Sequence, residues 1–398
     1  MDFGASQSHI STRKKLVFGL APLMFLLLAS EIVARVDRGT LLRLQNHRLL
    51  RLERVRRGYP SMTDPRLGYV PIPSYSSRDN LWQKQVSIDE TGFRSNGAAI
   101  RPEGRPIVAV GDSFTFGDEV NDDETWPAWL ERTLERPVIN GGVFGYSFGQ
   151  SILRAEKILG EQSADWLVVG FIPSDITRCE CAKWYAWKPY FELKDQGLAL
   201  HLPPAEALPL DAGEARLKRF KNALGYSALL DSLLAHTPAR SWWFMNERTI
   251  RVHPPGAGLE ISRRLVNRIA AHSREEGYRL LLVAQGHTAD GRATALIEHA
   301  RHTGVATLDL IAEFLAEEER DPGIRNRYFQ GHMTAEGNRW VANHVSRHIR
   351  EAESMLQGSS TSQMPRWSAR LSERFRGLRL RDRQEITSTF ECPIAPHL

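Results

Sequence analysis

The sequence predicts an α/β protein in which a parallel sheet is covered by helices on both faces. Short apolar runs rich in β-branched residues alternate with segments of helical spacing, and glycine turns follow several of the runs. The 398 residues are 42% hydrophobic and 25% charged, which is the composition of a globular protein. Length and composition together exclude a polytopic membrane protein, a collagen and a wholly disordered chain.

Five apolar runs are predicted to form the strands of the sheet. Runs this short and continuously apolar are typical of strands that are buried on both faces. They cover residues 107–110, 138–139, 167–171, 278–283 and 305–310.

Helical spacing predicts the segments that cover the sheet. One predicted helix, at 125–134, follows Asp122 and Asp123, whose carboxylates suit the positive end of a helix dipole. In the last one an apolar stripe recurs every four residues. The other predicted helices cover residues 151–159, 261–272 and 335–350.

The N-terminus predicts a membrane anchor within residues 1–36. Three basic residues at 13–15 precede 19 residues at 16–34 that are apolar or small except for Glu31, which is roughly the thickness of a bilayer. A cleavable secretory signal is the alternative, but Leu28 stands where its cleavage site needs a small residue. We expect a single-pass transmembrane helix with the body outside the cytoplasm, although the arginines that follow oppose this orientation.

Positive charge is concentrated in the flanks of the chain. Residues 1–57 and 357–398 carry a net +10, so residues 58–356 carry −5 of the total +5. This acidic balance argues against nucleic-acid binding by the globular region. Residues 37–63 predict a basic amphipathic linker that either lies on anionic headgroups or is a solvated connector. The Ser/Arg-rich residues 357–398 predict a disordered tail.

Residues 64–356 are predicted to form one domain with an aromatic-rich insertion at about 180–255. The tryptophans of the insertion either stack on sugar rings or pack its own core. His287 follows a predicted strand and either lines a pocket or lies in a solvated loop. The odd count of three cysteines does not form a disulfide framework, and no zinc-site spacing accompanies them, so we predict neither a metal nor a cofactor.

The strongest chemical motif is VAVGDSFTFG at 108–117. A buried strand runs into a tight turn that places Ser113 at the carboxyl edge of the sheet, where open α/β sheets bind ligands. A serine in this position is a nucleophile if a base reaches it. Gly111 precedes the serine by two residues and Gly117 follows it by four, so this is not the Gly-x-Ser-x-Gly elbow of α/β-hydrolases.

Three further segments belong to the same predicted edge. The turn NGGVFG at 140–145 presents backbone N–H groups that can face a developing oxyanion. Ser174 and Asp175 follow the next strand, and Asp175 is expected to cap the following turn. His332 lies just before the last predicted helix and is a candidate general base.

These four segments, in this order, resemble the SGNH/GDSL hydrolase family over roughly residues 64–350. The likeness is greatest to membrane-anchored bacterial members, through the lead-in sequences DPRLGY at 64–69 and GFR at 92–94. It implies a flavodoxin-like three-layer αβα sandwich with a five-stranded parallel sheet. It also implies esterase, lipase or carbohydrate acyl-ester chemistry, and in some members acyl transfer.

The resemblance also implies roles for individual residues. Ser113 is similar to the nucleophile of the family, and its own backbone N–H would serve the oxyanion hole. Gly145 matches a second oxyanion donor, and His332 matches the catalytic base. Asp112, which lies in the motif beside the nucleophile, is a supporting candidate.

Two positions depart from the family pattern. Ser174 stands where the family has an asparagine, so its hydroxyl would replace the third oxyanion donor. The aspartate that the family places two or three residues before the base is absent, because Phe329 and Gln330 stand there. Gln330 or a backbone carbonyl is then expected to accept the Nδ1–H of His332.

The sequence therefore predicts a membrane-anchored serine esterase that acts on acyl esters, foremost O-acetyl esters, of cell-envelope or exported carbohydrate. An O-acyltransferase of the same fold is one alternative. A catalytically inactive glycan-binding or assembly protein is the other, and the missing acid and the replaced asparagine are the observations that favour it.

Overall fold

The computed structural model describes residues 12–361 except 81, 98–101, 185, 196, 205–211, 238, 240–241 and 244–248. The chain forms two compact units, Met1–Val345 and Ser346–Leu398. The described part of the second unit is the C-terminal portion of α14 (Ala335–Thr361). The predicted disordered tail at 357–398 and Cys392 fall almost entirely outside the described residues.

A five-stranded parallel sheet lies at the centre of the first unit. Its strands are β5 (Ile107–Val110), β6 (Val138–Asn140), β7 (Trp166–Phe171), β13 (Arg279–Ala284) and β14 (Ala306–Asp309). They are ordered β14-β13-β7-β5-β6, which in chain order is the flavodoxin-like 2-1-3-4-5 arrangement. The predicted parallel sheet is confirmed, and every predicted strand end lies within one residue of the observed one. β5, β6 and β7 are buried along their whole length, as their unbroken apolar sequences require.

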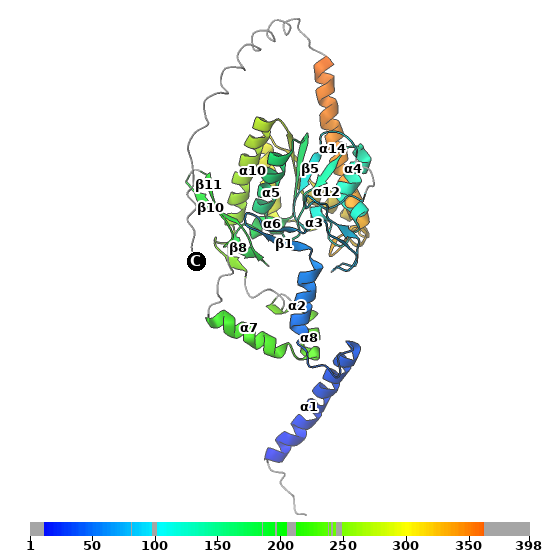
Figure 1. Cartoon of the computed structure of the whole chain (residues 1–398), viewed down its shortest axis with the longest axis vertical. Coiled ribbons are helices and arrows are strands. Elements are labelled where there is room, and N and C mark those ends of the chain that lie inside the picture. Colours follow the sequence, from blue (N-terminus) through cyan, green and yellow to red (C-terminus); the bar gives the residue numbers. More distant parts are fainter. Residues whose placement is uncertain are drawn as a thin grey trace, which may run out of the picture. The chain divides into compact units, whose positions relative to one another are not determined.

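Helices cover both faces of the sheet. Figure 1 shows α5 (Phe148–Glu161) and α10 (Ala257–Glu276) on one side of β5, and α4 (Trp126–Leu134) and α12 (Leu310–Arg320) on the other. α5 and α10 contact each other, while α4 contacts β6 and α12 contacts β13. The arrangement is therefore a three-layer αβα sandwich.

α4 agrees with the predicted helix at 125–134 within one residue, but it is capped by a different residue than expected. Asp122 and Asp123 form a separate 3-10 turn, η1 (Asp122–Glu124), and α4 begins after Thr125, whose side chain accepts the Ala128 N–H. α11 (Gly291–His302) and α12 were not predicted. The other elements near the sheet are α3 (Ser113–Phe116), α6 (Pro173–Arg178), α13 (Ile324–Tyr328), β1 (Ser61–Asp64), β2 (Gly68–Pro71), β3 (Ser76–Ser77), β4 (Val86–Ser87), β15 (Phe329–Gln330) and β16 (His332–Met333).

The insertion has two parts. In the residues of the insertion that the structure describes, the strands form a three-stranded sheet and a hairpin, and two helices precede the last strand along the chain. The strands are β8 (Cys181–Trp184), β9 (Ala186–Trp187), β10 (Tyr190–Lys194), β11 (Gly197–His201) and β12 (Ile250–Arg251), and the helices are α7 (Ala212–Leu224) and α8 (Ala228–Ala235).

The insertion helices bind the N-terminal helices α1 (Thr12–Asp37) and α2 (His47–Gly58) rather than lying beside the sheet alone. The Glu31 carboxylate of α1 accepts the backbone N–H groups that open α8. The buried carboxylate of Asp231 in α8 accepts from Arg38 and Arg51, and the indole of Trp243 donates to it. Trp243 is thus buried in this polar cluster, which is the packing alternative foreseen for the insertion aromatics.

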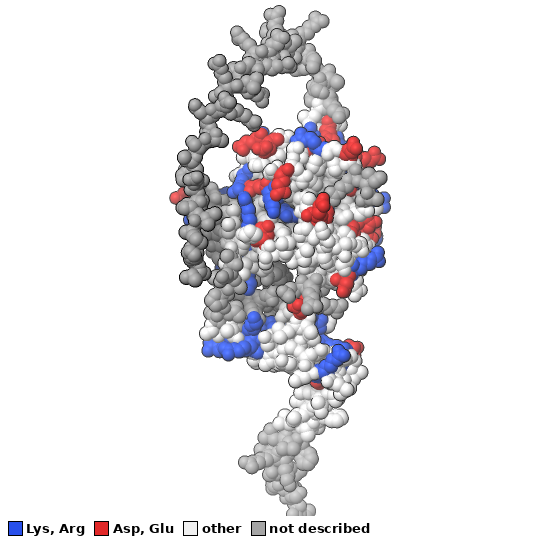
Figure 2. All heavy atoms as spheres, viewed as in Figure 1, with Lys and Arg blue, Asp and Glu red and all other residues white. Residues whose placement is uncertain are grey.

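The N-terminal prediction is not supported by the described residues. Within them, no helix combines the length and the apolar character that a membrane crossing requires. In Figure 2, Lys and Arg are interspersed with Asp and Glu over the visible face of the globular part, which fits the mild acidic balance of residues 58–356.

Candidate active site

Ser113 is placed at the first turn of α3 by the sharp turn that ends β5. Asp112 is the N-cap of α3 and accepts the Phe114 N–H, which fixes the direction in which the turn leaves the sheet. A side chain at Gly111 would lie 2.7 Å from the Gly170 carbonyl of β7, so only glycine fits between the two strands there. The Ser113 side chain consequently lies at the carboxyl edge between β5 and β7, the switch point of the sheet.

The structure brings His332 to this serine although 219 residues separate them. The Ser113 Oγ and the His332 Nε2 are 3.0 Å apart, which is a hydrogen bond. His332 belongs to the two-residue strand β16, which pairs with β15 immediately before α14. Only 6% of the Ser113 surface is exposed, so this hydrogen bond is largely shielded from water.

The other ring nitrogen of His332 faces a carboxylate that no sequence motif indicated. The Nδ1 lies 3.1 Å from the Glu119 Oε1, and the His332 backbone N–H donates to the Glu119 Oε2 at 3.4 Å. Glu119 lies three residues after the end of α3, and its φ of +70° is in the left-handed region that non-glycine residues rarely adopt. The sequence feature that could have indicated this carboxylate is the acidic pair Asp118-Glu119, which comes just after the nucleophile motif and so lies at the same sheet edge.

Asp118 places a second carboxyl group near the histidine. Its Oδ2 is 3.7 Å from the His332 Nε2, and the side chain is almost fully buried. Burial raises the pKa of Asp118 to about 7, and the positive charge of His332 opposes this rise. Burial lowers the pKa of His332, but the hydrogen bond that its Nδ1–H donates to Glu119 and the charge of Asp118 outweigh burial and raise that pKa to about 8. The same hydrogen bond lowers the pKa of Glu119.

The expectation that Gln330 or a backbone carbonyl accepts the Nδ1–H of His332 is wrong. Gln330 is exposed, and its amide donates to the Asn326 carbonyl. Glu119 reaches Nδ1 because the loop that carries it leaves the nucleophile helix at the same edge. The acid therefore comes from a different segment of the chain than the one on which the resembled family carries it.

Asp112 and Asp175 form a buried network beneath the serine. Arg178 Nη1 donates to the carboxylates of both, at 3.2 and 2.6 Å, and also to the Tyr146 carbonyl. Asp175 in addition accepts the Ile172 N–H at the start of α6. Burial raises the pKa of Asp175 well above its ordinary value, and the nearby Asp112 adds to this. Both aspartates position backbone turns, and neither bonds to His332.

The glycine turn after β6 packs against the nucleophile turn. The Val143 N–H donates to the Gly111 carbonyl, and a side chain at Gly142 would lie 2.4 Å from the Phe116 backbone nitrogen. Gly145 has a φ of +70°, and the buried Tyr69 hydroxyl donates to the Phe144 carbonyl beside it. Ser113, the glycine turn and Arg178 are thus held in one cluster.

Ser174 is the second residue of α6, and its side chain is exposed. Its predicted role as an oxyanion donor stays a prediction, as does that of Gly145.

His287 lies in the loop after β13, as one alternative expected, but it is half-buried there. Its ring packs on Phe329 at 4.6 Å between centroids, and Phe329 in turn contacts Phe114 beside the nucleophile. Burial lowers the pKa of His287. His287 therefore belongs to an aromatic cluster near the site rather than to the Ser113–His332 pair.

Cys179 and Cys181 are buried free thiols.

Comparison with known proteins finds similarity among solved structures only, because no family model and no curated protein matches the sequence. A protein of the G-D-S-L family from Desulfitobacterium hafniense DCB-2 is 13% identical over 61% of this chain and 99% of its own, with a TM-score of 0.31. LAE5, an α/β hydrolase enzyme from the metagenome of Lake Arreo, is 11% identical over 61% of this chain and 93% of its own, with a TM-score of 0.35.

Axe2, an acetylxylan esterase from Geobacillus stearothermophilus, is 13% identical over 62% of this chain and 95% of its own, with a TM-score of 0.35. The G-D-S-L family is the one that the sequence motifs resemble. Because these identities and TM-scores are low, we infer function from the site itself.

Proposed function

We propose that the protein is a serine esterase of the SGNH/GDSL type. The observation that carries the proposal is the 3.0 Å hydrogen bond between the Ser113 Oγ and the His332 Nε2 at the carboxyl edge of a flavodoxin-like sheet. A histidine in this contact takes the hydroxyl proton as the serine attacks a carbonyl. The missing aspartate favoured an inactive binding protein, but the carboxylate of Glu119 at the other ring nitrogen weighs against that alternative.

The reaction proceeds through an acyl-enzyme. The Ser113 Oγ attacks the carbonyl carbon of an ester while the His332 Nε2 accepts the hydroxyl proton. The tetrahedral oxyanion takes hydrogen bonds from the backbone N–H groups of Ser113 and Gly145 and from the Ser174 hydroxyl. His332 then donates its proton to the leaving alcohol, whose bond to carbon breaks. Water, deprotonated by His332, attacks the acyl-serine and releases the carboxylic acid and the free Ser113 hydroxyl.

The substrate class is proposed from the family resemblance to be acyl esters of carbohydrate, foremost O-acetyl esters. A sugar hydroxyl in place of water in the last step would make the same site an acyltransferase. p-Nitrophenyl esters of increasing chain length and acetylated xylan, each assayed with and without an added sugar acceptor, separate these possibilities.

Labelling with a fluorophosphonate probe tests the proposed nucleophile. We expect full-length protein to form a stoichiometric adduct, which peptide mass spectrometry maps to Ser113, because the histidine activates this hydroxyl over all others. His332→Ala should lose the adduct. His302→Ala is the matched control and should keep it, since His302 is exposed on α11 and bonds to the Glu298 carbonyl of its own helix. A folded protein that forms no adduct would contradict the proposal.

We also propose that α1 associates the protein with a membrane and that the catalytic unit lies outside the cytoplasm. The support is a group of exposed apolar side chains on α1, formed by Leu20, Leu23, Met24, Phe25, Leu26, Leu27, Leu28, Ile32, Val33 and Val36. Such a surface is stable in contact with lipid and costly in water.

Vesicle flotation tests this association. Full-length protein is expected to float with vesicles that contain phosphatidylglycerol, and Phe25→Asp with Leu28→Asp should keep it at the bottom of the gradient. Leu202→Asp serves as the control, because Leu202 is an equally exposed leucine outside α1. If the double variant floats as wild type does, α1 is not the membrane-binding element.

A further inference from the structure

The structure assigns Glu119 as the positioning acid of the active site, in a place that the family pattern does not provide. This inference rests on the proposed esterase function and adds to it a third residue. Glu119 would hold His332 in the tautomer whose Nε2 faces Ser113 and stabilise the imidazolium that forms when the proton is taken.

The first support is the geometry of the two ring nitrogens. An imidazole acts as a base through the nitrogen that lacks a proton, and a partner on the opposite nitrogen decides which one that is. The Ser113 Oγ lies at Nε2 and the Glu119 Oε1 at Nδ1, so the carboxylate accepts the Nδ1–H and leaves the Nε2 lone pair toward the serine.

The second support is that Glu119 makes two contacts to His332 instead of one. Its other oxygen, Oε2, accepts the backbone N–H of the same histidine. A carboxylate held by ring and backbone together fixes the ring relative to the short strand β16 that carries it. An ordinary surface ion pair needs only one contact between the two side chains, whereas Glu119 also binds the backbone of His332.

The third support is the backbone that carries the acid. Glu119 is held at a φ of +70°, a conformation that is unfavourable for a non-glycine residue and that the surrounding structure has to enforce. The buried guanidinium of Arg94 enforces it, because it donates to the Gly117 and Val120 carbonyls on either side of the acidic pair. Non-glycine residues in this conformation are found disproportionately at active sites.

The neighbouring Asp118 does not fill this role. Its Oδ2 approaches the His332 Nε2, the nitrogen that already bonds to Ser113, and at 3.7 Å it is beyond hydrogen-bond distance. The charged or titratable groups that face the imidazole are therefore Glu119 at Nδ1 and Asp118 near Nε2, with Asp112 beneath the serine.

One consequence is that nucleophile and acid come from one continuous segment. The amides of Gly117 and Asp118 both donate to the Ser113 carbonyl, so residues 113–119 form a single hydrogen-bonded unit. His332 lies between the two ends of this unit. In the family pattern, by contrast, the acid lies on the same segment as the base.

Glu119→Gln tests the inference, because it keeps the shape of the side chain and removes its charge. We expect kcat/KM for a p-nitrophenyl ester to fall between about 10²- and 10⁴-fold, the upper value being the cost of neutralising a buried triad carboxylate. His332 acts as a base only when neutral, so kcat/KM of wild type should rise with pH around 8. Without the Glu119 charge the imidazolium is less stable, and this midpoint should move to lower pH.

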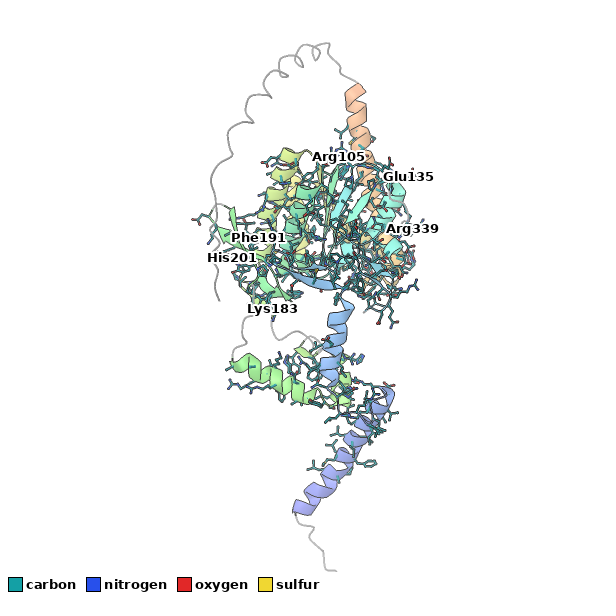
Figure 3. The ribbon with its side chains drawn as sticks, in the orientation of Figure 1. Arg105, Glu135, Lys183, Phe191, His201 and Arg339 are labelled. Carbon is teal, nitrogen blue, oxygen red and sulfur yellow. The ribbon has the colours of Figure 1, made fainter. Side chains whose placement is uncertain are left out.

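Glu135→Gln is the matched control. Glu135 is also a glutamate with positive φ, +52°, but it ends α4 and lies at the edge of the globular part in Figure 3. Its substitution should leave kcat/KM and the pH midpoint unchanged. Thermal unfolding of both variants confirms that they are folded.

Two outcomes would overturn the inference: a Glu119→Gln variant within threefold of wild type, or one that loses activity without any shift of the pH midpoint. The second would show a structural role alone. Failure of the proposed function is distinguishable, because wild type itself would then show neither ester turnover nor a fluorophosphonate adduct on Ser113.

Discussion

Ser113→Ala is expected to abolish ester hydrolysis while the protein stays folded. Loss of a catalytic serine in a serine hydrolase lowers kcat on the order of 10⁶-fold, because no other group forms the acyl-enzyme. Residual hydrolysis above the uncatalysed rate, about 10³-fold or more, would come from the oxyanion donors and substrate binding alone. Steady-state turnover of a p-nitrophenyl acyl ester by purified full-length protein measures the effect.

The fold should tolerate this change because the Ser113 hydroxyl bonds to His332 and, at 3.4 Å, to Asp112, and it supports no backbone turn. Circular dichroism and the unfolding midpoint should match wild type. Ser273→Ala is a matched control, since Ser273 is a partly buried serine on α10 whose hydroxyl donates to the Ala270 carbonyl. An alanine variant at 113 that retains turnover would mean that the proposed nucleophile is wrong.

Arg94→Met is expected to destabilise the protein by about 3–5 kcal/mol, the typical cost of removing one partner of a buried ion pair. Arg94 is fully buried, forms an ion pair with Asp122 at 2.9 Å and lies over the Phe116 ring. Its guanidinium also donates to four backbone carbonyls, those of Gln85, Phe116, Gly117 and Val120. Methionine fills much of the volume but donates no hydrogen bond, so the carbonyls of Gly117 and Val120 lose the buried donor that Arg94 supplies.

Urea unfolding followed by circular dichroism measures this loss. Arg105→Met is the control, because Arg105 lies at the edge of the globular part in Figure 3 and pairs with the exposed Asp165. A surface pair of this kind contributes at most about 1 kcal/mol. If the two substitutions lower the free energy of unfolding equally, the buried contacts of Arg94 do not stabilise the protein as proposed. Since Arg94 holds both sides of the Asp118-Glu119 pair, its loss should also lower esterase activity in the fraction that remains folded.

Local sequence was sufficient for the sheet and for the nucleophile turn. Unbroken apolar runs such as Ile107–Val110 predict strands, because a strand that is buried on both faces of a sheet needs apolar residues at every position. The position of Ser113 depends on Gly111 and Asp112, its immediate neighbours, because a close strand crossing and an N-cap are local requirements. Features whose causes lie within a few residues could therefore be predicted.

The start of α4 was predicted within one residue, but the residue that caps it was not. The acidic residues 122–124 satisfy the pattern of a helix N-terminus, yet Thr125 provides the cap of α4 and they form a 3-10 turn instead.

Contacts between distant segments became visible only in the folded chain. The acid at the Nδ1 of His332 comes from residue 119, which is 213 residues away along the chain, so no spacing rule centred on the histidine finds it. Likewise, Arg48 of the predicted basic linker is buried against Trp243 of the insertion. The order of the amino acids was enough to identify most of the residues that can carry the chemistry and the sheet edge at which they lie. Only the folded structure shows which of them meet. Hydrogen bonds and ion pairs depend on distances of a few ångströms in space and not on separation along the chain.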